Sequence, residues 1–180
     1  MPTHKRATLT ADGEIGQAYL TEARQQLQEC HRKIRHCLEQ LTDEQVWWRA
    51  GDDFNSIANL LLHLNGNIGQ RVLSLIGGLP RERNRAQEFA ERGPISKAEL
   101  LSRFDETVQQ ADAVLAALPA ARLLETRRYQ MLAGEVEKTL LAIILHTLVH
   151  LGGHTQEIVA LTRMQLRERY RFQLPQSSPR

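Results

Sequence analysis

The sequence predicts an all-α protein, a single domain built as a bundle of four long helices. Over four long stretches, apolar residues recur at steps of three, four and seven, which is the spacing of one helix face. No stretch shows a convincing alternation of apolar and polar residues, the mark of a half-buried strand. With 180 residues the chain is large enough to bury a core, so we treat residues 1–180 as one unit.

Composition and charge narrow the classes of partner. Lysine and arginine total 23 against 21 acidic residues, a net charge of +2 with histidine neutral. This balance argues against nucleic acid and anionic membranes as partners. No apolar run approaches the roughly 20 residues of a membrane span, and no signal-peptide apolar region follows the N-terminus. We therefore expect a soluble, cytoplasmic protein, with Cys30 and Cys37 reduced and packed in the core.

The first helix is predicted from Glu14 to Leu41. Its apolar residues repeat every seven positions, the stripe that helical bundles bury: Leu20, Leu27, Ile34 and Leu41. Residues 1–12 carry no such pattern, and we expect them to be flexible. The tail is rich in proline and serine, and we expect the same of residues 175–180.

Capping signals mark the next two helices. The segment Phe54-Asn-Ser56 offers an N-cap, and the helix that it opens runs to about Ile76, ahead of a Gly-Gly pair and a proline. The charged stretch 81–95 is weakly periodic, and we predict a loop with a short helical piece. Ser96 starts a capping box with Glu99 and opens a third helix, which ends near Leu118.

The last helix is predicted from about Glu135 to Arg167, after a connection over residues 120–134 that we expect to be extended near 127–131. The helix contains the pair Gly152-Gly153. Each glycine costs about 1 kcal/mol relative to alanine in a helix interior. The pair therefore suggests the close approach of another helix or of a ligand.

Three histidines recur at steps of four in this apolar helix: His146, His150 and His154. Residues four apart lie on one helix face, so two neighbouring imidazoles can bind one divalent ion. Spacing does not decide between the pairs 146/150 and 150/154. A third ligand must come from a facing helix, and His63 lies among core leucines there. An unpaired buried imidazole would cost about 1–3 kcal/mol. The alternative is that these histidines are hydrogen-bonded core residues.

Two polar residues are further candidates for the site. Asn67 follows His63 by four positions and shares its helix face, where it could hydrogen-bond a ligand. The alternative is a structural role at helix ends. Glu157 follows His154 by three positions and is a candidate hydrogen-bond acceptor for that histidine or a general base. The alternative is an exposed, solvated carboxylate.

Two motifs together resemble the DinB-like superfamily. They are residues 55–67 (NSIANLLLHLNGN) and 150–158 (HLGGHTQEI), and neither is specific alone. The similarity covers about residues 16–172 and includes the Trp47-Trp48 pair and the segment 85–89 (RAQEF). It is closest to a bacterial subfamily without an assigned activity.

The resemblance implies a DinB-like four-helix bundle, often a homodimer, that holds a divalent metal ion on three histidines. One histidine comes from the second helix and two, spaced by four, from the last. Carried over to this chain, the ligands are His63, His150 and His154, with zinc or nickel as the metal. His146 is then a neighbour one turn away, in the core or behind the ligands. Relatives have a Gly-Gln pair shortly after the last histidine, where this chain has Gln156-Glu157.

For function, the resemblance implies a metal-dependent transferase or hydrolase. The metal would activate water or a low-molecular-weight thiol toward a small-molecule substrate. The alternative is a non-catalytic dimeric bundle with a structural or empty metal site, acting as a binding or stress-response module. A solvent-reachable cavity at the histidines favours the first interpretation, and a closed site with a fourth protein ligand favours the second.

Overall fold

The computed structural model describes residues 11–93, 95–131 and 134–172. The segments expected to be flexible, 1–12 and 175–180, lie outside these ranges except for Ala11 and Asp12. Those two residues are the first residues of a helix and not loose chain.

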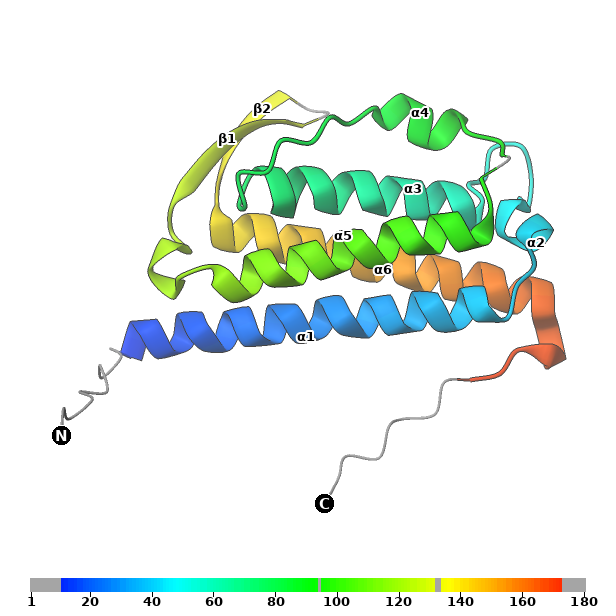
Figure 1. Ribbon diagram of the computed structural model, residues 1–180, viewed down its shortest axis with the longest axis horizontal. Coiled ribbons are helices and arrows are strands. Elements are labelled where there is room, and N and C mark those ends of the chain that lie inside the picture. The colour runs from blue at the N-terminus through cyan, green and yellow to red at the C-terminus, as the bar shows by residue number, and fades with distance from the viewer. Residues whose placement is uncertain (1–10, 94, 132–133, 173–180) are drawn as a thin grey trace, which may run out of the picture.

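The described chain is mostly helical, with one small antiparallel sheet (Figure 1). Its α-helices are α1 (Ala11–Glu39), α2 (Asp43–Trp47), α3 (Ile57–Ile68), α4 (Arg85–Ala90), α5 (Lys97–Ala117) and α6 (Leu140–Leu166). A π-helix, η1 (Gly69–Ser74), continues α3, and two 3-10 turns are η2 (Ala120–Arg122) and η3 (Arg167–Arg169). The strands are β1 (Thr126–Met131) and β2 (Gly134–Thr139). The all-α prediction therefore holds broadly, apart from the hairpin.

Helices α1, α3, α5 and α6 lie side by side (Figure 1). Helix α1 packs against α5 and α6, and α3 packs against the same two. Helices α1 and α6 run in one direction and α3 and α5 in the other, while α4 lies along the outer side of α3. The predicted heptad stripe of α1 is buried, as burial of an apolar helix face requires. Cys37 is buried, Cys30 is partly buried, and both are free thiols.

Capping residues set the helix starts close to where the sequence places them. Ser56 caps α3 in a complete capping box with Asn59. Ser96 caps α5 by accepting a hydrogen bond from the backbone N–H of Glu99. The second helix, predicted to end near Ile76, continues through η1 to Ser74, and its backbone changes from α to π at Gly69.

The prediction that the last helix begins near Glu135 is wrong. Residues 134–139 form β2, which pairs with β1 so that Thr126 faces Thr139 and Met131 faces Gly134. The extended backbone expected near 127–131 is confirmed. Both strands alternate between exposed and partly buried residues, nearly all polar, so the period of two is hard to see. Helix α6 begins only at Leu140, where Thr139 accepts the N–H of Ala142.

Helix α6 is the longest apolar element, at 27 residues, yet no helix in the described ranges is both long and apolar enough to cross a bilayer. No other helix in the described structure makes the close approach predicted at Gly152 and Gly153, and the alternative, a ligand at this pair, stays a prediction. A Cβ atom added at either position would meet nothing within 4 Å. These glycines therefore leave a stretch of the α6 surface open.

Candidate metal centre

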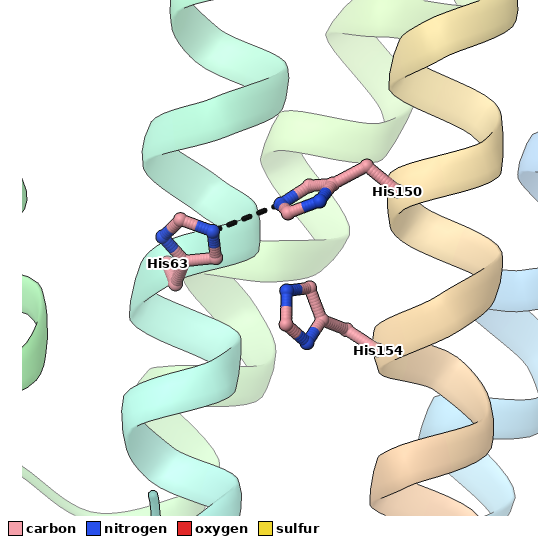
Figure 2. A group of neighbouring side chains, drawn as sticks. All are labelled: His63, His150 and His154. Atoms are coloured by element: carbon pink, nitrogen blue, oxygen red, sulfur yellow. Dashed lines mark hydrogen bonds between the residues drawn. The ribbon is translucent and has the colours of Figure 1, made fainter. Parts of the chain in front are cut away.

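Helices α3 and α6 bring three histidines together (Figure 2). His63 comes from α3, and His150 and His154 lie one turn apart on α6. One ring nitrogen from each lies within 4.8 Å of the other two, and the Nε2 atoms of His63 and His150 are 2.9 Å apart. A tetrahedral zinc ion with Zn–N bonds of about 2.0–2.1 Å separates its ligand nitrogens by roughly 3.3 Å. The spacing of the rings therefore suits a metal ion after small adjustments.

The hydrogen bonds behind the rings leave nitrogen lone pairs at the centre. Nδ1 of His63 is 2.9 Å from Glu88 Oε2, and Nδ1 of His154 is 2.8 Å from Glu157 Oε2. Nη2 of Arg83 also lies 3.2 Å from Nδ1 of His63, but it donates to Glu88 Oε2 at the shorter distance of 2.9 Å. A carboxylate only accepts, so we assign the proton to each Nδ1 and a lone pair to each Nε2. A proton on Nε2 of His150 could be donated to the lone pair of His63 or of His154, but not to both. A divalent cation would satisfy all three nitrogens, so the donor set fits a metal ion.

Glu88 is a buried carboxylate that holds His63 in place. It lies on α4 with 8% of its surface exposed, and its two oxygens also accept from Nε and Nη2 of Arg83 at 2.7 and 2.9 Å. Burial raises the pKa of Glu88, but the hydrogen bonds from His63 and Arg83, with the charge of Arg83, outweigh burial and leave this pKa below its ordinary value. The carboxylate is therefore ionised at neutral pH and fixes the ring orientation of His63.

His150 needs no deprotonation to act as a ligand. Burial, followed by the charges of His154 and His63, lowers its pKa to about 4. The imidazole is neutral at pH 7, as metal binding requires.

The other predicted site residues, His146, Asn67 and Glu157, lie around the three histidines and outside the group itself. His146 is exposed and outside the histidine group, so its prediction as a core residue is wrong; it lines a cavity beside His150. Asn67 is 5% exposed and lines the same cavity, and its Oδ1 atom has no hydrogen-bond partner among the described residues. Glu157 is exposed and is also the hydrogen-bond acceptor for His154.

The cavity has a volume of about 470 Å³ and reaches two of the three histidines, His63 and His150. Its walls come from α3, η1, the segment before α4, the first residue of α4, the end of β1 and α6. Beyond the histidines and Asn67, the lining is cationic and amide-bearing: Gln70, Arg71, Arg83, Arg85 and Gln130, with Met131. A small molecule can therefore approach the imidazoles from this side.

Neither Glu88 nor Arg83 is predicted as a site residue by the sequence. Both lie in a charged stretch in which Glu88 is one of several acidic residues, with Glu82 and Glu91 on either side. Periodicity does not separate them, and α4 has only six residues. The segment 85–89 is part of the resemblance to the DinB-like superfamily, and it was the one feature of the sequence that could have indicated a role for Glu88.

Gly66 permits the approach of Glu88 to α3, because a Cβ atom there would overlap the carboxylate and press on Nε of Arg83. We expect Gly66→Ala to displace Glu88 and to weaken zinc binding by about tenfold or more. The gain of about 1 kcal/mol in helix propensity does not restore this contact. Competition with a chromophoric chelator measures the zinc affinity.

Gly153→Ala is the matched control, since its Cβ atom enters open space in α6. It should stabilise the fold by about 0.5–1 kcal/mol and leave the zinc affinity as in wild type. An unchanged affinity in Gly66→Ala would show that Glu88 does not depend on this close approach.

Comparison with known proteins identifies a family without an assigned function. Residues 14–176 match the profile of a family described as "Protein of unknown function (DUF1572)". The structure is similar to the crystal structure of a conserved protein from Enterococcus faecalis, with a TM-score of 0.64, 13% identity, and coverage of 80% of this chain and 95% of that chain. At this identity the similarity establishes the fold alone. No curated protein matches the chain.

Proposed function

This chain belongs to the DUF1572 family, and we propose that it is a metal-dependent transferase or hydrolase with a DinB-like four-helix bundle. The proposed ligands are His63, His150 and His154. The observation that carries the proposal is the convergence of three imidazole nitrogens beside a cavity. The order of the ligands along the chain, one on α3 and two spaced by four on α6, supports the DinB-like assignment.

The donor set favours a catalytic site over a structural one. Structural zinc sites are closed by four protein ligands, whereas catalytic sites use three and keep one position open. No other histidine, cysteine or carboxylate in the described ranges joins the group of three. All-imidazole ligation suits zinc and nickel.

A divalent ion bound by these histidines would lower the pKa of a water molecule or thiol at its open position and so supply a nucleophile at neutral pH. The chain's own residues orient the site. Glu88 fixes the ring of His63 and makes its Nε2 a stronger ligand, and Glu157 does the same for His154. The cavity beside His63 and His150 admits the second reactant.

Cobalt substitution tests this proposal. We expect the protein to bind about one equivalent of Co²⁺ and to show the visible absorption of a site with few protein ligands. Addition of cysteine should then produce a thiolate-to-cobalt band in the near ultraviolet. A cobalt spectrum that no thiol, azide or cyanide perturbs would indicate a closed site and the non-catalytic alternative. Failure to bind cobalt, zinc or nickel would refute the metal centre itself.

A further inference from the structure

Arg71 is a buried cation that has no anionic partner among the residues that the structure describes. Its side chain belongs to η1 and is 9% exposed. Its Nε atom has no hydrogen-bond partner among the described residues, and Nη1 donates to the Tyr129 hydroxyl at 3.3 Å. The guanidinium also lies over the Tyr129 ring, 5.5 Å from its centroid. Buried arginines are normally paired, because an uncompensated charge in the interior is costly. Arg71 forms no ion pair with any described residue.

The cavity that Arg71 lines has the same unbalanced charge. Arg85, at its exposed rim, stacks on the Phe89 ring at 4.9 Å and has no carboxylate partner in the described part of the chain. Arg83 differs, since Glu88 neutralises it. Within the described ranges, no aspartate or glutamate lines the cavity. Two guanidinium groups without counter-charges therefore make it attractive to an anion.

The backbone also directs Arg71 toward the histidines. His63, Asn67 and Arg71 follow at steps of four and all line the cavity. In an α-helix such a series drifts by about 40° per step. The wider turns of η1 reduce the drift before Arg71 and keep it on the cavity face. π-Helical turns are rare and occur frequently at functional sites.

From these contacts we infer that the cavity binds a small organic anion whose carboxylate or phosphate group is held by Arg71 and Arg85. Guanidinium groups match the geometry of both oxyanions. The buried amide of Asn67, between Arg71 and His63, is then available to the same molecule. The inference rests on the proposed function and deepens it by naming the substrate class: an anionic compound bound with its reactive part toward His63 and His150.

The Nε–H group of Arg71 provides a direct test by NMR with isotope-labelled arginine. The His63→Ala protein is used, so that an anion cannot be detected through a bound metal ion. The Arg71 signal is assigned by its loss in Arg71→Met. Inorganic phosphate and malonate are titrated separately at constant ionic strength, with chloride as the reference. We expect at least one of them, and not chloride, to shift the Arg71 signal saturably. The stronger of the two identifies the group.

A variant pair separates specific binding from general charge effects. In the otherwise unchanged protein, Arg71→Met should weaken binding of the effective anion about tenfold or more, and Arg71→Lys should recover part of it. Arg103→Met removes an exposed arginine paired with Glu99 on α5 and should bind as wild type. Equal responses to chloride, phosphate and malonate, or equal binding by Arg71→Met and Arg103→Met, would overturn the inference.

The outcome is separable from the metal proposal. Metal content of the wild-type protein, after incubation with Zn²⁺ and Ni²⁺, is measured by mass spectrometry. A protein that binds metal but no anion refutes the anion site alone. A protein that binds the anion through Arg71 but takes up no metal refutes the proposed function and leaves the anion site established.

Discussion

Replacing His63 with alanine is expected to reduce the metal content of the purified protein from about one equivalent to nearly none. The change removes the α3 ligand and leaves two imidazoles on one turn of α6. It also removes one hydrogen-bond donor to Glu88, whose remaining side-chain donor is Arg83. Mass spectrometry of untagged protein, after incubation with Zn²⁺ and Ni²⁺, measures the effect.

His146→Ala is the matched control for the ligand assignment. His146 lies one turn before His150 on α6 and lines the same cavity, but it is not in the group of three. This variant should keep its metal, while His150→Ala and His154→Ala should lose it. Metal loss in His146→Ala with retention in His154→Ala would contradict the assignment and favour the other pair that the spacing allows.

Replacing Glu88 with alanine should produce the largest loss of stability. Arg83 is 12% exposed at its side chain and would remain in the interior without its carboxylate. Breaking a buried ion pair in this way typically costs about 3–5 kcal/mol. Loss of the acceptor behind His63 should also weaken metal binding about 10–100-fold. Denaturant unfolding of the metal-free protein and zinc competition measure the two effects separately.

Two further variants control the Glu88 experiment. Glu88→Gln keeps the shape and one acceptor oxygen but removes the charge, and we expect an intermediate loss in both measurements. Glu91→Ala, at the partly exposed residue that follows α4, should leave stability and zinc affinity nearly unchanged. If Glu88→Ala unfolds at the same denaturant concentration as Glu91→Ala, the buried network contributes nothing net.

Much of the fold could be predicted because its signals are local. The heptad stripe of α1 and the caps at Ser56 and Ser96 each depend on residues a few positions apart. The grouping of His63 with two histidines of α6 was predicted in the same way, as an imidazole among leucines facing a helix with its own histidines. The choice of His154 over His146 required the resemblance, because both lie one turn from His150.

The features that were missed depend on contacts between distant segments. Glu88 differs from its acidic neighbours only because α4 packs on α3 next to Gly66. The hairpin strands are rich in charged and polar residues, and pairing across the turn, not composition, makes them strands. The π-helical turns of η1 likewise have no known signature in residue spacing. These three features depend on contacts that form only in the folded chain, so residue spacing does not reveal them.

The junction between α3 and η1 lies between His63, a proposed metal ligand, and Arg71, a proposed anion ligand. Insertions or deletions at this junction would therefore affect anion binding and leave metal binding unchanged. A deletion of one residue between Ile68 and Arg71 would turn the arginine by roughly 100° about the helix axis, and His63, upstream of the deletion, would keep its position. Changes in segment length could therefore retune which molecules the protein accepts while the histidine centre persists. Substitutions at the histidines would have the opposite effect. Homologous chains that bind different molecules would then differ in the length of this segment as much as in its residues.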